Sequence, residues 1–127
     1  MKYYTTIEQS KKLIELGLNP MTADMLYTSL DNFKEPWVWN SKPGMHPSDV
    51  PCWSTEALLD ILDETIVTEE DDEYRLNFGK DGTSYYMFYE DVYRLKDNVI
   101  EELDFSCSTL LECTFEMIVK LKEFKLK

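Results

Sequence analysis

Apolar residues recur at helical spacing in three stretches of the chain, and each stretch begins with a capping signal. In the first, Thr5 and Thr6 each precede an acid or amide by three residues, so either can be the N-cap of a capping box. Gly17 occupies the place where a helix commonly ends in a left-handed residue. This pattern predicts a helix over Ile7–Leu16.

The second stretch, PCWSTEALLDIL, predicts a helix over Ser54–Leu62. With Ser54 as the N-cap, Trp53 directly precedes the cap and Leu58 is the fourth helical residue, which is the spacing of a hydrophobic staple. We therefore expect Trp53 to lie in the core. Cys52 is expected to be a buried or half-buried inert thiol.

The third stretch predicts a helix over Thr109–Phe124, in which Thr109 and Glu112 again have capping-box spacing. Only a narrow polar strip interrupts its apolar surface. Most of this helix is expected to be buried.

An alternating pattern predicts a β-hairpin over Tyr74–Glu90. Asp81 and Gly82 are a strong signal for a two-residue turn between the strands Tyr74–Gly79 and Thr83–Glu90. The cross-strand pairs expected from that turn are Phe78 with Tyr85, Leu76 with Met87, and Tyr74 with Tyr89. Short additional strands are expected at Ile66–Val67 and Val92–Leu95.

Together these elements predict an α+β protein with a small antiparallel sheet built around the Tyr74–Glu90 hairpin and packed on about three helices. The chain has 127 residues, of which 43% are hydrophobic. This length suits one core, so we predict a single domain over 1–127.

A segment rich in proline and turn residues separates Asn32 from Val50 and carries Trp37 and Trp39 on the same side of any extended stretch. One interpretation is that one or both indoles cap the core. The other is that they form an aromatic contact surface for a partner or ligand.

The formal net charge is −12, and 16 of the 25 acids lie in two windows without a basic residue, between Lys42 and Arg75 and between Lys96 and Lys120. The densest part is an acidic run of five adjacent residues: Glu69, Glu70, Asp71, Asp72 and Glu73. A field of this sign repels phosphates, which disfavours direct binding to nucleic acid or anionic membranes. The acidic run is either a solvated loop or a contact surface for a basic protein partner.

The search for catalytic, cofactor and metal motifs yields no candidate residue. The sequence has no glycine-rich phosphate loop, no HExxH, no CxxC and no EF-hand loop. The one histidine, His46, has no local spacing that would pair it with Cys52 as a nucleophile or gather the cysteines around zinc. We therefore predict no cofactor, no metal and no catalytic residue.

The expected compartment is the cytoplasm. No apolar leader follows the first residues, and no stretch approaches the roughly 20 apolar residues of a membrane span. The three cysteines, Cys52, Cys107 and Cys113, suit free thiols in a reducing environment better than a disulfide framework.

The phrases TIEQSKKLIELGLNPMTADM, PCWSTEALLDIL and FEMIVKL resemble a family of small uncharacterised proteins from gut Bacteroidales genomes, their prophages and mobile elements. The similarity spans most of the chain, although the lysine-rich KEFKLK departs from the neutral tail expected at the end of the last helix. The resemblance implies a cytoplasmic protein carried on mobile DNA. It implies no activity, cofactor or site residue.

These observations predict a non-enzymatic binding or accessory protein of a phage or mobile element, which acts through protein–protein contacts on the aromatic segment or the acidic surface. The candidate partner surface comprises Trp37, Trp39, Glu69, Glu70, Asp71, Asp72 and Glu73. One alternative is an acidic DNA mimic that inhibits a host defence protein, and another is a small enzyme. No pattern in the sequence indicates an oligomeric state.

Overall fold

The computed structural model describes residues 3–39, 46–93, 99–124 and 126. Among these residues it shows an α+β protein with three α-helices and two small antiparallel sheets, which confirms the predicted fold class. The chain divides into two compact units, Met1–Ile61 and Leu62–Lys127, called the N-terminal and C-terminal units below. The single domain expected over 1–127 stays a prediction.

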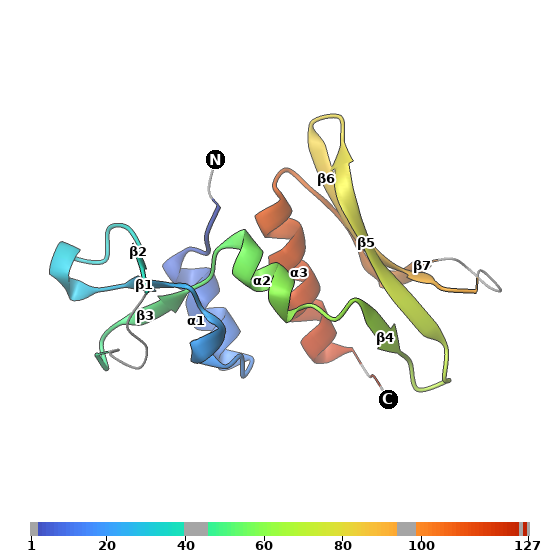
Figure 1. Ribbon diagram of the computed structural model, residues 1–127, viewed down its shortest axis with the longest axis horizontal. Helices are drawn as coiled ribbons and strands as arrows, with labels where there is room; N and C mark the ends of the chain where they lie inside the picture. Colours follow the sequence, from blue (N-terminus) through green and yellow to red (C-terminus); the bar gives the residue numbers. More distant parts are fainter. Residues whose placement is uncertain (1–2, 40–45, 94–98, 125, 127) are drawn as a thin grey trace. The chain divides into compact units, whose positions relative to one another are not determined.

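The N-terminal unit combines two helices with a three-stranded sheet of order β2-β1-β3. All pairings in this sheet are antiparallel, and α1 contacts the edge strand β3 (Figure 1). Its elements are α1 (Ile7–Glu15), the 3₁₀ turn η1 (Pro20–Thr22), β1 (Met25–Tyr27), the 3₁₀ turn η2 (Ser29–Asp31), β2 (Trp37–Val38), β3 (Val50–Cys52) and α2 (Thr55–Ile61).

The ends of α1 follow the sequence signals. Thr6 is the N-cap, since its hydroxyl accepts a hydrogen bond from the Gln9 N–H at 3.1 Å while the Gln9 side chain accepts one from the Thr6 N–H at 2.9 Å. At the other end Gly17 has a φ of 94°, and the Leu18 N–H returns to the Leu13 carbonyl at 3.1 Å. The predicted helix is confirmed to within a residue at its C-terminus.

The start of α2 confirms the predicted cap and the buried tryptophan. The Ser54 hydroxyl accepts a hydrogen bond from the Ala57 N–H at 3.1 Å. Trp53 and Leu58 are both fully buried, as the hydrophobic staple requires. The Trp53 indole N–H donates to the Thr22 hydroxyl at 2.9 Å, so the polar edge of the ring is also satisfied.

A buried polar network centred on Thr5 ties the N-terminal unit together. The Thr5 hydroxyl lies 2.7 Å from the Ser10 hydroxyl and accepts a hydrogen bond from the Trp53 N–H at 3.1 Å. The Thr5 carbonyl accepts from the Tyr27 hydroxyl at 2.8 Å and from the Cys52 thiol at 3.3 Å. Thr5 thus joins the segment before α1 to α1, β1 and β3. Because buried polar groups are normally hydrogen-bonded, we expect the loss of these bonds to lower the stability of the unit.

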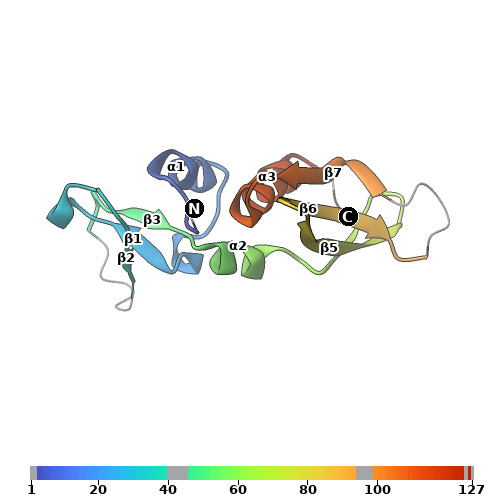
Figure 2. The same ribbon diagram turned by 90° about the horizontal axis from the view of Figure 1, so that it is seen from above.

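The C-terminal unit is a four-stranded antiparallel meander of order β4-β5-β6-β7 with one helix packed on it. Figures 1 and 2 show α3 beside β6 and β7, the strands that it contacts. None of the described helices is long and apolar enough to cross a membrane. The elements are β4 (Thr65–Val67), β5 (Glu73–Asp81), β6 (Ser84–Asp91), β7 (Val99–Cys107) and α3 (Leu110–Glu123).

The β5–β6 hairpin exists, but its predicted register is wrong by two residues. Asp81 pairs with Ser84, so the two-residue loop is Gly82 and Thr83 rather than Asp81 and Gly82. Gly82, at the first loop position, has a φ of 63°, and a glycine there is what a type II′ turn requires. The observed pairs are Phe78 with Met87, Leu76 with Tyr89, and Tyr74 with Asp91.

The slip of two residues leaves each side chain on its predicted face, because side chains alternate with a period of two. Met87 and Tyr89 are fully buried, as expected for the face toward the core.

The flanking strands were predicted only in part. Ile66 and Val67 belong to β4, as expected. Val92 and Tyr93, however, form a turn rather than a strand, and Leu95 lies outside the described residues. The strand that extends the hairpin is β7, whose register on β6 shifts between Phe88 and Glu90.

The face of β6 that carries Tyr86 and Phe88 is opposite to the buried face of Met87 and Tyr89. The Tyr86 and Phe88 rings are stacked with centroids 5.8 Å apart. Tyr86 also lies over Gly79, its partner on β5, so closely that a Cβ at position 79 would come within 2.6 Å of the Tyr86 hydroxyl. The absence of a side chain at Gly79 is what makes room for the ring.

Candidate binding surfaces

The two tryptophans of the aromatic segment have different environments. Trp37 in β2 is 49% exposed, whereas Trp39 is only 8% exposed and belongs to the core. Of the two candidate contact residues, only Trp37 is therefore available on the surface. Its indole N–H donates to the Asp31 carboxylate at 3.2 Å, which fixes the orientation of the exposed ring.

The pKa of the Asp31 carboxyl group is shifted in the direction that favours its role as the acceptor. Partial burial acts to raise its pKa, but hydrogen bonds from the Trp37 indole and from backbone N–H groups outweigh it, so the pKa is lowered overall. The carboxylate is therefore ionised at neutral pH, and the Trp37 ring is held by a charge-assisted hydrogen bond.

The acidic run lies in the turn between β4 and β5, and its last residue, Glu73, begins β5. The turn is closed by hydrogen bonds on Thr68, which is 6% exposed. The Thr68 N–H donates to the Asp72 carbonyl at 2.9 Å, and the Asp71 N–H donates to the Thr68 carbonyl at 3.0 Å. Asp71 adopts a φ of 67°, the left-handed region that aspartate tolerates. Glu69, Glu70 and Asp71 are exposed on this ordered backbone.

A second group of carboxylates lies on the edge strand β7. Glu101, Glu102 and Asp104 are all exposed. Charged side chains on an edge strand hinder pairing with another sheet, which gives them a structural role as well. The acids of the C-terminal unit thus occupy both an ordered turn and an edge strand.

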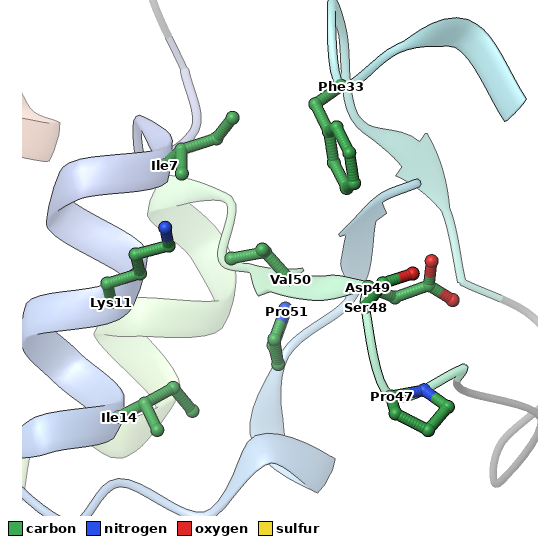
Figure 3. Close-up of a pocket in the computed structure, with 9 residues that line it drawn as sticks. All are labelled: Ile7, Lys11, Ile14, Phe33, Pro47, Ser48, Asp49, Val50 and Pro51. Atoms are coloured by element: carbon green, nitrogen blue, oxygen red, sulfur yellow. The ribbon is translucent and has the colours of Figure 1, made fainter. Parts of the chain in front are cut away.

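A groove in the N-terminal unit has a volume of about 480 Å³. Figure 3 shows side chains from α1 on one side, Phe33 and the segment before β3 on the other, and Val50 and Pro51 between them. Its lining residues are Ile7, Lys11, Ile14, Phe33, Pro47, Ser48, Asp49, Val50 and Pro51. We call this cavity the α1–β3 groove.

Phe33 reaches the groove from a strained backbone. Asn32 and Phe33 have φ values of 61° and 59°, so two consecutive residues other than glycine are left-handed. Asparagine tolerates this region, but for a bulky residue such as phenylalanine it costs on the order of 1–3 kcal/mol. The Phe33 N–H donates to the Thr28 carbonyl at 3.0 Å, which holds the segment in this conformation.

Two charged residues are among the lining residues, and Figure 3 shows them on opposite sides, with the Asp49 carboxylate directed away from α1. Lys11 comes from α1, and no carboxylate of the described residues forms an ion pair with it. Asp49 precedes β3 and accepts a hydrogen bond from the His46 N–H through Oδ2 at 2.9 Å. Its other oxygen, Oδ1, is buried and has no hydrogen-bond partner within the described part of the chain. Because Asp49 Oδ1 is buried from solvent, the groove presents the exposed Lys11 ammonium group but not this acceptor.

The sequence contained a signal for this groove. Ile7, Lys11 and Ile14 recur at positions i, i+4 and i+7 and so share one face of α1. The opposite wall could not be inferred, because the 31 to 39 segment that carries Phe33 lacks a periodic pattern.

The thiols are poor nucleophiles. Cys52 is fully buried, and burial raises its pKa to about 11. Burial, followed by a hydrogen bond with Cys107, raises the pKa of Cys113 to about 12. His46 is exposed, with its ring 2.8 Å from the Ser48 hydroxyl. Across the described residues no three His, Cys, Asp or Glu side chains gather in an arrangement suited to a metal ion.

Comparisons with known proteins place the chain in no group. No protein-family model matches it, and neither the curated proteins nor the solved structures contain a significant match.

Proposed function

We propose that this chain is a non-enzymatic binding protein, an accessory of a phage or mobile element that docks a basic protein partner on the acidic surface of its C-terminal unit. The three free cysteines support a reducing, cytoplasmic setting. The proposed surface is the acidic run in the turn between β4 and β5.

The observation that carries the proposal is the ordered backbone under the acidic run. Adjacent carboxylates repel one another, yet three exposed acids are held together on a turn closed around Thr68. An ordered array of one sign is suited to steer and orient a partner of the opposite sign.

The charge balance of the two units supports this choice of surface. Residues 1–61 contain eight acids and five bases, whereas residues 62–127 contain seventeen acids and eight bases. The formal net charges are therefore −3 and −9. A basic partner is attracted mainly to the C-terminal unit.

The test is affinity capture from a host lysate, followed by mass spectrometry of the retained proteins, with the wild-type chain and two variants. In the run variant, Glu69, Glu70 and Glu73 become Gln and Asp71 and Asp72 become Asn. In the control variant, five exposed acids of the N-terminal unit are changed in the same way, so both variants lose the same charge. The control positions are Glu8, Glu15, Glu35, Glu56 and Asp60.

We expect a basic protein to be retained by the wild type and the control variant and lost with the run variant. Retention should also fall steeply as salt rises, because exposed charges are screened beyond about 8 Å at physiological ionic strength. Equal retention by the run variant, or equal loss with the control variant, would refute the acidic docking surface.

A second candidate function is a DNA mimic that inhibits a host defence protein. One observation favours it: the exposed acids are not confined to the run, since β7 presents three more. A DNA mimic occupies the DNA-binding site of its target, so duplex DNA should displace the captured protein from this chain. If the partner stays bound at saturating DNA, the mimic hypothesis fails and the general docking proposal remains.

A further inference from the structure

We propose that the edge of the C-terminal sheet at β4 accepts a short basic strand of the partner protein, and that a segment of this chain with the same chemistry competes for that edge. The competing segment comprises Lys125, Leu126 and Lys127, and we call it the KLK segment. The proposal rests on the acidic docking surface proposed above. It adds how the partner is held there and what the partner must displace.

The position of β4 in the sheet makes it a place for strand addition. Within the described residues the strand order is β4-β5-β6-β7, so β4 is an edge strand. An edge strand offers backbone groups to another extended segment. β4 ends at Val67 and the acidic run begins at Glu69, so only Thr68 separates them. A strand added at this edge therefore lies beside the acidic run.

One residue from a distant part of the chain already pairs at this edge. Leu126 forms an isolated antiparallel bridge with Thr68. Thr68 is the buried residue on which the turn closes. Leu126 is 37% exposed, so more than half of its surface is covered. The edge at Thr68 thus accepts an extended residue and covers part of an apolar side chain.

The segment that pairs at this edge is rich in lysine. Residues 120–127 contain four of the eight bases of the C-terminal unit and one acid, Glu123. Glu123 already forms an ion pair with Lys120, with 3.8 Å between Oε2 and Nζ. Lys125 and Lys127 flank the bridging residue in the sequence. The bridge therefore joins the most basic stretch of this unit to the most acidic one, which is charge complementarity within one chain.

The KLK segment indicates what a partner strand must provide. The partner strand must be extended, because it pairs with an edge. It needs an apolar residue opposite Thr68, as Leu126 is. It also needs cations beside that residue, because Glu69 and Glu70 are exposed there. Main-chain hydrogen bonds give affinity in strand addition and alternate side chains give specificity. A strand with a lysine–apolar–lysine pattern meets these requirements.

A segment of the same chain is an effective competitor. A tethered segment acts at an effective concentration of about 1 mM, so the partner strand gains the edge only where it pairs better than the KLK segment does. Weak basic ligands are therefore excluded, and the competition adds specificity to an attraction that depends only on charge.

The experiment titrates the full chain with three capped peptides, observed through the methyl NMR signals of Thr68 and Leu126. The first peptide alternates lysine with leucine. In the second glutamate replaces lysine, and in the third proline replaces leucine, which removes backbone donors and prevents strand pairing. We expect the lysine–leucine peptide alone to shift the Thr68 signal saturably and to move the Leu126 signals toward those of a solvent-exposed leucine.

Two variants that lose the same charge test the competition. In the segment variant Lys125 and Lys127 become Gln. In the helix variant Lys120 and Lys122, which are exposed on α3, become Gln. We expect the segment variant to bind the lysine–leucine peptide about tenfold more tightly than the wild type, because its competitor is weakened, and the helix variant to stay within about twofold. Circular dichroism checks that both variants are folded.

Several results would overturn the proposal. Equal affinities of the segment variant and the helix variant would show that the KLK segment does not compete. Equal binding of the proline peptide would show that charge alone holds the peptide, without strand addition. Self-association of the wild type that Leu126→Asp abolishes would show that the edge pairs with a second copy of this chain. An absence of binding at millimolar lysine–leucine peptide would refute the edge as a site.

Failure of the docking surface has a different signature. The run variant should bind the lysine–leucine peptide at least about tenfold more weakly than the wild type. If the run variant loses the peptide but the segment variant gains no affinity, the docking surface stands and the competition fails. If the run variant binds like the wild type while the segment variant still gains affinity, the competition stands and the acidic docking surface fails.

Discussion

The two units are stabilised in different ways. The N-terminal unit has strands of only two or three residues and relies on a few buried side-chain hydrogen bonds around Thr5. The C-terminal unit has three strands of eight or nine residues, whose long ladders and contacts with α3 form its core. A unit with few ladder bonds is sensitive to single side chains, whereas a unit with long ladders is sensitive to the backbone conformation of its turns.

The same difference extends to the kind of surface that each unit presents. The unit built from irregular segments contains the α1–β3 groove, because segments of different origin leave a cavity where they meet. The unit built from a regular sheet offers turns and an edge strand, on which charge is displayed. The groove and the densest group of exposed acids thus lie in different units.

The largest expected effect comes from Trp53 in the N-terminal unit. Trp53→Ala removes a fully buried indole and its hydrogen bond to Thr22, so the free energy of unfolding should fall by about 3–5 kcal/mol. Urea denaturation followed by circular dichroism measures the loss. Trp37→Ala is the control, because that indole is 49% exposed and should change stability far less. Equal losses from the two substitutions would contradict the assigned burial.

A pair of threonine substitutions sharpens the comparison between the units. Both Thr5 and Thr114 are fully buried, but the Thr114 hydroxyl only donates to the Leu110 carbonyl of its own helix at 2.7 Å. Thr5→Val leaves the Trp53 N–H without its acceptor and the Ser10 hydroxyl without its partner, which should cost about 1–3 kcal/mol. Thr114→Val should cost clearly less by the same denaturation assay. If the order is reversed, the Thr5 network is not what holds the N-terminal unit together.

A turn substitution tests the backbone sensitivity of the C-terminal unit. Gly82→Val places a β-branched residue at a φ of 63° and should destabilise the protein by about 1–2 kcal/mol. Nothing crowds the Cβ position of Gly82, so the loss would reflect backbone strain alone. Gly82→Asn should be milder, since asparagine is not β-branched and adopts positive φ more readily than valine. Thermal melts of both variants check this order, and an unchanged Gly82→Val melt would contradict the turn.

The smallest effect concerns pH and Cys52. Because burial raises the pKa of this thiol from 9.0 to about 11, the unfolded chain ionises first as the pH rises. The stability contributed by the neutral thiol is therefore present below about pH 9 and is lost toward pH 11, with about 1 kcal/mol gone at pH 10. Cys52→Ala should make the decline between pH 8 and pH 10 shallower. An identical decline in both proteins would show that Cys52 titrates normally.

The helices were predictable because their signals are local. The Thr6 capping box, the left-handed Gly17 and the Ser54 cap each lie within a few residues of the helix that they define. Trp53 could be assigned to the core for the same reason, since the staple spacing is readable without knowledge of the tertiary structure.

The strands were less predictable, for two physical reasons. Strands of two or three residues, such as β1 and β2, are too short to establish an alternating pattern. In β7, Leu103, Phe105 and Cys107 alternate with polar residues, which is a strand pattern. The acids in the same stretch were interpreted only as part of the charge distribution, so the strand was not predicted. The hairpin register depended on whether the loop was Asp81 and Gly82 or Gly82 and Thr83, and both choices place Gly82 in the loop.

The two candidate sites were predictable to different degrees. The acidic run is visible in the sequence, whereas its ordered backbone depends on the buried Thr68. The groove depends on the convergence of α1, Phe33 and the segment before β3, and no local pattern specifies a meeting of three separate segments.

The contact between Gly79 and Tyr86 has a consequence for how this sequence can evolve. Any side chain at position 79 would displace the Tyr86 ring and, with it, the stack on Phe88. The two positions are therefore coupled, because a side chain at 79 requires the Tyr86 ring to move aside. In an alignment of relatives, we expect glycine at 79 to accompany an aromatic residue at 86, and this correlated pair would identify neighbouring strands from sequences alone.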